Sequence, residues 1–268
     1  MNTLLESTNI ESWQQQTSFG HAIQGFHRQV ENPEQRVHFL HGTGFSAGTL
    51  IPLMHLMPES WDCYISNIPG HGGSTWNEDR APNWLEMADA LAESIRKKMD
   101  VENKGPVVGI GHSFGGMMSQ EIAAIMPIRK VLIISSIKSR KELPPHFSII
   151  KKLGIQHVMS KSVTLASLPL WGKYHDYVSK EEQTLFKDMV DRHSSSDLRW
   201  ALTQLSGWQT PPMREGTELV HIHGEGDRTF PIKRIQQPVH VIKGGGHFMV
   251  YKQAELVGDL IKSSLPGD

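Results

Sequence analysis

The chain has 268 residues, and its 27 basic and 28 acidic residues give a formal net charge of −1 at pH 7. This length suits one large domain with a substantial core. The charges form no long run of one sign, so the sequence lacks the basic pattern of a nucleic-acid or anionic-membrane binder, and we expect neither partner. Cys63 is the single cysteine, which excludes an intrachain disulfide and a cysteine-based metal cluster.

The N-terminal residues 1–16 are polar and lack the apolar core of a signal peptide. No run of the sequence reaches the roughly 18 apolar residues that a membrane span needs. We therefore expect a soluble, cytoplasmic protein. The sequence leaves open whether this protein is a monomer or a homodimer.

Six short runs rich in Val and Ile have the length of β-strands and are bounded by Gly, Pro or Asn. Between several of them, apolar residues recur every three or four positions, as from Trp84 to Met99, where Asn83 and Glu86 form a predicted capping box. This alternation predicts an α/β fold with helices on both faces of a mostly parallel sheet. A β/α barrel also alternates, but residues 139–212 interrupt the pattern. The predicted strands are 37–40, 63–68, 106–110, 131–134, 219–222 and 239–242.

Residues 139–212 combine helix-like stretches with most of the larger aromatic residues. Ser179 and Glu182 predict a capped helix that runs to about residue 192, and a second helix is predicted from about Ser196. We interpret this span as a helical cap over a core made of residues 1–138 and 213–268. Its aromatic residues either line a substrate pocket or form the core of the cap itself, and they are Trp171, Tyr174, Tyr177, Trp200 and Trp208.

A serine lies at a predicted strand-to-helix junction. Ser113 follows the apolar run 106–110 and precedes a helix-compatible run that ends near Met126. Gly111 and Gly115 permit a turn that is too tight for larger side chains, and such a turn exposes the serine hydroxyl. A Gly-x-Ser-x-Gly sequence can arise by chance in a loop, but its position between a strand and a helix indicates a nucleophile.

A serine hydroxyl needs a base to take its proton, and a histidine base needs an acceptor that orients it. His247 follows a predicted strand and three glycines, and Asp227 follows another predicted strand. The carboxyl ends of the strands are where ligands bind in open α/β sheets. The developing oxyanion needs N–H donors, which we assign to Phe114 and to Thr43, with Gly44 as the alternative to Thr43.

Five motifs between about residues 37 and 250 follow one another in order, and they are His41-Gly42, Asn67-Ile-Pro-Gly-His-Gly72, Gly111-His-Ser-Phe-Gly-Gly116, Gly224-x-x-Asp227 and Gly246-His247. Together they resemble the signatures of the α/β-hydrolase superfamily, in its serine-nucleophile esterase and thioesterase branch. The resemblance implies an eight-stranded, mostly parallel sheet with a helical lid inserted after the sixth strand. It also implies that Ser113 is the nucleophile, Asp227 the acid and His247 the base.

The sequence departs from the family pattern in two places. Asn67 stands where an aspartate often precedes Pro-Gly-His-Gly, and we expect a structural role for this residue. Only 19 residues separate Asp227 from His247, enough for little more than one short helix. This short spacing leaves the relative placement of acid and base to be tested.

Other histidines and glycines suggest rival sites. His221 and His223 alternate on a predicted strand, but Glu225 and Gly226 stand where a metallo-β-lactamase-like site needs Asp and His. Residues 244–246 lack the helix and the Lys-Ser/Thr pair that a phosphate-binding loop requires. We expect no metal and no cofactor. Three histidines beside motif glycines are expected to shape loops through hydrogen bonds, and they are His41, His71 and His112.

The sequence therefore predicts a serine hydrolase that cleaves a small or medium carboxylic ester or thioester through an acyl-enzyme on Ser113. Phe45, Met117 and Trp200 are expected to bound an apolar acyl pocket for this small-molecule substrate. One alternative within the same fold is a cofactor-independent carbon–carbon bond hydrolase or acyltransferase. An alternative of another class is a non-catalytic ligand receptor with this fold.

Overall fold

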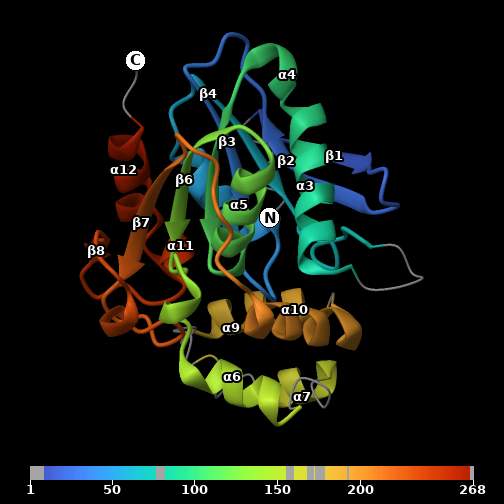
Figure 1. Cartoon of the computed structure of the whole chain (residues 1–268), viewed down its shortest axis with the longest axis vertical. Coiled ribbons are helices and arrows are strands. Elements are labelled where there is room, and N and C mark those ends of the chain that lie inside the picture. The colour runs from blue at the N-terminus through green and yellow to red at the C-terminus, as the bar shows by residue number, and fades with distance from the viewer. Residues whose placement is uncertain are drawn as a thin grey trace.

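The computed structural model describes residues 9–76, 82–154, 160–167, 172, 179–191 and 193–265. Their strands form one eight-stranded sheet in the order β1-β2-β4-β3-β5-β6-β7-β8 (Figure 1). β1 pairs antiparallel with β2, and β2 pairs antiparallel with β4. The six strands β3 to β8 are parallel to one another. The strands are β1 Glu11–Gln16, β2 Ala22–Arg28, β3 Gln35–Leu40, β4 Trp61–Ser66, β5 Val107–His112, β6 Ile128–Ile134, β7 Glu218–Gly224 and β8 His240–Ile242.

The predicted α/β fold and its mostly parallel sheet are confirmed, and each of the six predicted runs overlaps one of the strands β3 to β8. The sequence did not reveal β1 and β2. β1 lies at the edge of the sheet, and Trp13 is its one buried side chain between exposed polar neighbours. An antiparallel edge strand with a solvated face has no continuous apolar run from which it could be predicted.

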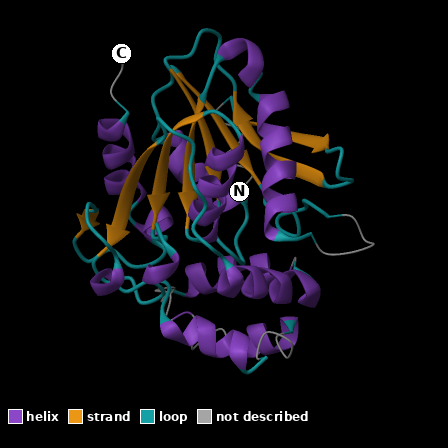
Figure 2. Cartoon of the chain, viewed as in Figure 1, coloured by secondary structure: helices purple, strands orange, loops and turns teal. Residues whose placement is uncertain are grey.

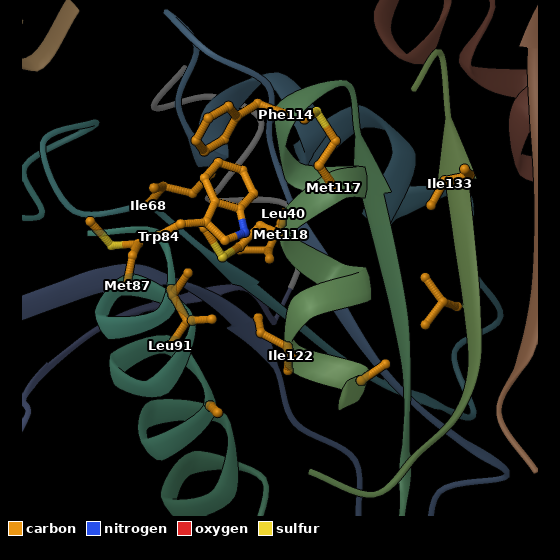
Figure 3. Packing of buried hydrophobic residues seen from close by; sticks show 14 of the residues in the cluster. Leu40, Ile68, Trp84, Met87, Leu91, Phe114, Met117, Met118, Ile122 and Ile133 are labelled. Atoms are coloured by element: carbon orange, nitrogen blue, oxygen red, sulfur yellow. The ribbon is translucent and has the colours of Figure 1, made fainter. Parts of the chain in front are cut away.

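Helices cover both faces of the sheet. On one face, α3 (Trp84–Lys98) packs against α5 (Phe114–Ile125), and their large side chains interdigitate around Trp84 and Phe114 (Figure 3). Asn83 accepts from the Glu86 N–H at 3.0 Å and Glu86 accepts from the Asn83 N–H at 2.8 Å, which confirms the predicted capping box. A second buried cluster fills the opposite face. Its helices are η1 Ala47–Leu50, α2 Ile51–His55, α11 Met249–Lys252 and α12 Ala254–Ser264, and α4 (Val101–Lys104) follows α3.

Residues 139–212, which we call the inserted segment, leave the sheet after β6 and return at β7. The described helices of this segment lie beyond the arrowheads of β6 and β7 (Figures 1 and 2). The Ser179–Glu182 capping box is confirmed by two hydrogen bonds of 3.0 and 3.1 Å. The division into a core and a cap domain stays a prediction. The helices are η2 Arg140–Glu142, α6 Pro145–Lys152, α7 Lys161–Ala166, α9 Lys180–Asp191 and α10 Ser195–Gly207, and η4 Ile232–Arg234 lies between β7 and β8.

The aromatic residues of the inserted segment have different surroundings. Trp200 is buried on α10, the helix predicted from about Ser196. Trp208 follows the last residue of α10 with φ −55° and ψ 140°, and its indole N–H donates to Glu121 at 2.8 Å. This hydrogen bond connects the end of α10 with α5. Trp171, Tyr174 and Tyr177 lie outside the described residues.

Two glycines on β5 give a matched test of the turn that follows this strand. A Cβ on Gly111 would lie 2.3 Å from the Gly115 carbonyl oxygen, whereas a Cβ on Gly109 would meet its nearest neighbour at 3.7 Å. We predict that Gly111→Ala lowers the free energy of unfolding by about 3 kcal/mol or more, because the backbone must move. Gly109→Ala should change it by no more than about 1 kcal/mol. Chemical denaturation of both variants checks this, and equal effects would contradict it.

Candidate active site

Ser113 sits in the one-residue turn between β5 and α5, with φ 53° and ψ −119°. A positive φ is a strained conformation for a non-glycine residue. A hydrogen bond stabilises this turn, because the Ser136 hydroxyl donates to the Ser113 carbonyl oxygen at 2.7 Å. It is also crowded, since a Cβ on Gly115 would lie 2.4 Å from the Leu40 carbonyl oxygen. The sequence motif therefore forms the predicted elbow, with the serine raised at the carboxyl edge of the sheet.

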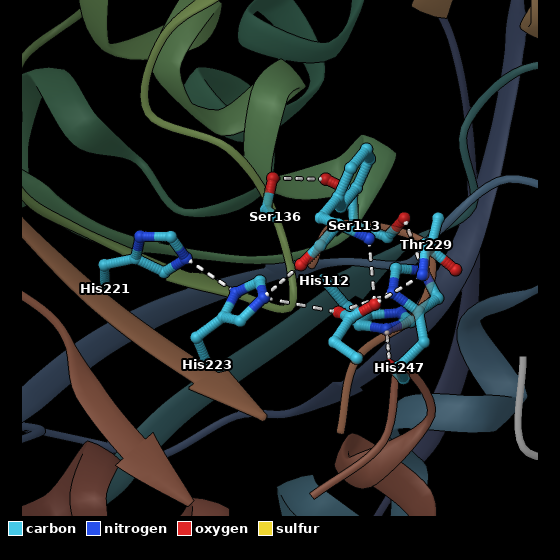
Figure 4. Close-up of polar contacts among 9 residues, drawn as sticks. His112, Ser113, Ser136, His221, His223, Thr229 and His247 are labelled. Carbon is cyan, nitrogen blue, oxygen red and sulfur yellow. Dashed lines mark hydrogen bonds and ion pairs between the residues drawn. The ribbon is translucent and has the colours of Figure 1, made fainter. Parts of the chain in front are cut away.

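The structure brings together the three residues that the sequence assigned as nucleophile, base and acid, of which Figure 4 labels Ser113 and His247. The Ser113 hydroxyl and His247 Nε2 are 3.0 Å apart, and His247 Nδ1 is 2.9 Å from Asp227 Oδ2. Asp227 Oδ1 accepts from the N–H groups of Thr229 and Phe230 at 2.8 and 2.9 Å. An imidazole in this position has one nitrogen on the hydroxyl and the other on the carboxylate, as proton transfer requires.

The short connection between Asp227 and His247 is sufficient because their two loops pack backbone to backbone. The Gly226 N–H donates to the Gly245 carbonyl oxygen at 2.8 Å. A Cβ on Gly224 would lie 2.3 Å from the same oxygen, so only glycine fits there. The predicted single short helix is present as η4. Asp227 and His247 are therefore in contact although only 19 residues separate them.

Asp227 is almost completely buried, at 3% exposure. Burial by itself raises the pKa of a carboxyl group. Here the charge of protonated His247, its hydrogen bond and the backbone donor at Phe230 outweigh burial, so the pKa of Asp227 lies below its ordinary value. The carboxylate is therefore ionised at neutral pH and available to orient His247.

The loop after β3 passes directly beside the serine. A Cβ on Gly42 would lie 3.1 Å from the Ser113 Cβ, so the peptide that carries the Thr43 N–H starts at that point. Within the described chain, the N–H groups of Thr43, Gly44 and Phe114 donate to no protein acceptor. The two predicted oxyanion donors, and the alternative at Gly44, are thus unengaged, and they lie at the start of α5 and in the loop after β3, which meet at Ser113.

The three histidines beside motif glycines hydrogen-bond to backbone groups of loops, as predicted, and His71 does so from Nδ1 to the Pro69 carbonyl oxygen at 3.4 Å. His41 donates from Nδ1 to the Gly42 carbonyl at 2.8 Å, and its Nε2 accepts from the Ile68 N–H at 3.1 Å. His112 donates from Nε2 to the His247 carbonyl oxygen at 2.9 Å, which ties the base-bearing loop to β5. Burial lowers the pKa of His41 to about 4 and that of His112 to about 3, so both rings are neutral at pH 7.

Asn67 also has the expected structural role. Its side-chain oxygen accepts from the Ala47 N–H at 2.6 Å, and its amide donates to the Gly72 carbonyl at 3.1 Å. A neutral amide serves both partners, whereas an aspartate has no donor for Gly72. His71 lies in the same loop and contacts the ring of His193 from the inserted segment at 4.4 Å between centroids. The loop therefore connects the region beside the oxyanion donors with the inserted segment.

The three predicted pocket residues have different surroundings. Phe45 stacks on Phe248 with ring centroids 5.0 Å apart. Trp200 lies against Phe114 at 5.9 Å, near the elbow. Met117 is fully buried and belongs to the same core cluster as Phe114 (Figure 3), and its role in a substrate pocket stays a prediction.

Phe186 is an aromatic residue near the site that the sequence did not single out. It lies on α9, and its ring meets Phe45 edge-on at 5.8 Å. A Cβ on Gly44 would lie 3.7 Å from the same ring. Phe186 therefore covers the loop with the predicted oxyanion donors. Nothing in its local sequence distinguishes it from the other apolar positions of that helix.

His221 and His223 turn toward each other on β7, with His221 Nε2 3.0 Å from His223 Nδ1. The ring nitrogens that face each other are therefore engaged in a hydrogen bond. Among the described residues, no group of three or more His, Cys, Asp or Glu side chains is arranged to hold a metal ion. In the same part of the chain, no helix has the length and apolar character of a membrane span.

Buried neutral histidines make the stability of the fold sensitive to acid. Burial lowers the pKa of His38 to about 3 and that of His221 to about 2, in addition to His41 and His112. The unfolded chain binds protons at these groups below about pH 6.5, where the folded chain does not. We predict that the free energy of unfolding falls as the pH drops from about 6.5 toward 4.

Urea denaturation at several pH values measures this slope. Replacing His38 by Gln should reduce the proton uptake on unfolding by about one proton. The same change at the exposed His240 is the matched control and should leave the slope unaltered. A slope that is the same in the wild type and in His38→Gln would show that His38 is not held neutral.

Comparisons with known proteins find relatives of this sequence and of this fold. Lipase LipV of Mycobacterium tuberculosis is 34% identical over 92 residues, which cover 34% of this chain and 33% of that lipase. The chain thus matches about a third of that relative's length. A putative lipase from Acinetobacter baumannii AYE has a TM-score of 0.79 at 14% identity, over 98% of this chain and 93% of that chain. An esterase from Exiguobacterium antarcticum has a TM-score of 0.75 at 17% identity, over 94% and 98%.

The two solved structures show that this fold is shared across large differences in sequence. The model of the Alpha/beta hydrolase family matches residues 39–260, which include the elbow, both loops of the site and most of the sheet. The chain belongs to the alpha/beta hydrolase family.

Proposed function

We propose that the chain is a serine hydrolase that cleaves small or medium carboxylic esters or thioesters through an acyl-enzyme. The observation that carries this proposal is the continuous series of contacts from the Ser113 hydroxyl through His247 to the buried Asp227 carboxylate. Such a series removes the proton of a serine as it attacks a carbonyl carbon. The similarity to a lipase and to lipase and esterase structures supports ester chemistry.

In this proposal His247 Nε2 takes the Ser113 proton while Oγ bonds to the carbonyl carbon. The carbonyl oxygen becomes an oxyanion, which the N–H groups of Phe114 and Thr43 or Gly44 stabilise. His247 then returns the proton to the leaving alcohol or thiol, and the acyl group stays on Ser113. Water then attacks the acyl-enzyme in the same way, with His247 taking its proton, and this step releases the carboxylic acid and restores the Ser113 hydroxyl. Asp227 keeps its negative charge throughout and stabilises the imidazolium.

The proposal is tested by incubation with a fluorophosphonate, which bonds covalently to an activated serine. We expect intact-protein mass spectrometry to show one adduct, and peptide mapping to place it on Ser113. Ser113→Ala should give no adduct and no turnover of p-nitrophenyl esters, because the nucleophile is absent. Ser263→Ala, at an exposed serine on α12, is the matched control and should react like the wild type.

The outcomes separate the candidate functions. Ester turnover that persists in Ser113→Ala would contradict the proposal. Consumption of a β-diketone with no turnover of esters or thioesters would instead favour a carbon–carbon bond hydrolase. Tight ligand binding that survives Ser113→Ala without turnover of any acyl substrate would favour a receptor.

The contact between Phe186 and the loop of Phe45 predicts a role in substrate binding. We expect Phe186→Ala to raise KM about tenfold for esters with an apolar acyl chain, because an aromatic wall of the pocket is lost. The value of kcat should change much less, since the triad is not touched. Phe19→Ala, at an aromatic residue that is 39% exposed and outside the site, is the control. Steady-state kinetics with a series of acyl chain lengths measures both constants, and an unchanged KM in Phe186→Ala would contradict the prediction.

A further inference from the structure

Two buried imidazoles on β7, His221 and His223, lie beside the triad (Figure 4). His223 Nε2 donates to the Phe230 carbonyl oxygen at 2.7 Å and lies 3.6 Å from Asp227 Oδ2. His221 Nε2 lies 3.0 Å from His223 Nδ1. The exposed fractions of His221 and His223 are 2% and 0%, so water does not compete for these contacts. The proposed hydrolysis mechanism uses neither ring.

The Phe230 carbonyl determines the tautomer of both rings. A carbonyl oxygen only accepts, so His223 carries its proton on Nε2. In the neutral ring Nδ1 is then an acceptor, and His221 must donate to it from Nε2. The groups that act on the pair are Asp227, His247, Lys138 and Glu142, but burial is the largest influence and lowers the pKa of both rings. The pair is therefore neutral at the pH of an ordinary assay, and its hydrogen bonds run in one direction.

Phe230 connects this pair to the acid and to the base. Its N–H donates to Asp227 Oδ1 at 2.9 Å. Its side chain is fully buried, and its ring meets the His247 imidazole edge-on at 5.6 Å between centroids. His223 thus holds, through the carbonyl oxygen, the same residue that binds the carboxylate through its N–H and packs on the base through its ring.

We propose that His223 is a positioning residue for the Asp227–His247 pair and that His221 sets its orientation. This inference rests on the proposed function, because it assigns His223 an effect on the rate of attack by Ser113. Without the His223 donor, the Phe230 carbonyl is left unpaired in a buried turn, and the turn must shift. Asp227 then stabilises the His247 imidazolium less well.

The test compares His223→Leu with His223→Gln, which retains an N–H donor for the Phe230 carbonyl. The readout is the second-order rate of fluorophosphonate labelling per reactive site, measured across the weakly acidic and neutral pH range. We expect His223→Leu to react about 10- to 100-fold more slowly, because a small misplacement of catalytic groups has effects of that size. The midpoint of its acid limb should move to lower pH, since a less stabilised imidazolium loses its proton more readily. His223→Gln should recover most of the rate.

His38→Gln is the matched control for the replacement of a buried neutral histidine. His38 is 2% exposed, and its ring contacts Ser66 at 2.7 Å on β3 and β4, away from the triad. We expect this variant to lose thermal stability while its labelling rate per reactive site and its pH midpoint stay at the wild-type values. A purely structural role of His223 would give this same pattern in His223→Leu, and that result would overturn the proposal.

The failure of the proposed function has a different signature. If the wild type forms no adduct at all, the hydrolase proposal is wrong, and the positioning of Asp227 is measured by proton NMR instead. The His247 Nδ1 proton gives a low-field resonance while it is hydrogen-bonded to the carboxylate. We expect this resonance to move and to exchange faster in His223→Leu but not in His38→Gln. An identical resonance in the wild type and His223→Leu would overturn the positioning role independently of any activity.

Discussion

The backbone at Ser113 turns through φ 53° and ψ −119° between a fully buried strand and a largely buried helix, and the rest of the site is arranged around this turn. A residue with a Cβ adopts such angles only where its neighbours hold it. Gly111 and Gly115 leave room for the turn, and Ser136 bonds its carbonyl oxygen. In return, the turn raises the hydroxyl at the carboxyl edge of the sheet and leaves the Phe114 N–H unengaged at the start of α5.

The other parts of the site reach this point from separate strand ends, and backbone contacts hold them in register. His112 bonds the carbonyl oxygen of His247, and Gly226 bonds that of Gly245. Asn67 joins the loop after β4 to the start of η1. Each of these groups is neutral and buried. By contrast, the Asp227 carboxylate is ionised at neutral pH and lies 2.9 Å from His247 Nδ1.

The elements that could be predicted from the sequence are those whose signals are local. Strands β3 to β8 are short Val- and Ile-rich runs, and the helices at Asn83 and Ser179 begin with capping boxes, so neighbouring residues specify both. The elbow and the order of its partners were recognisable because glycines and histidines stand at constrained turns. β1 and β2 were missed because these antiparallel strands mix polar with apolar residues, so neither forms a continuous apolar run.

Residues that act through long-range contacts were also missed. Phe186 reaches the loop of Phe45 only because α9 packs there, and its position on that helix carries no distinguishing signal. His223 was considered only as a metal ligand. The sequence does not show that the Phe230 carbonyl oxygen accepts a hydrogen bond from this ring. The pairing of these residues depends on how separate loops meet, and one chain without its fold does not contain that information.

The central claim is that Ser113 carries the acyl group during turnover. The most direct measurement mixes the protein with an excess of an activated ester, quenches it with acid within one turnover and analyses the peptides by mass spectrometry. The account predicts that the peptide with Ser113 gains the mass of the acyl group, and that this adduct disappears as the ester is exhausted. Ester consumption with no acyl group on Ser113 at any time would contradict it.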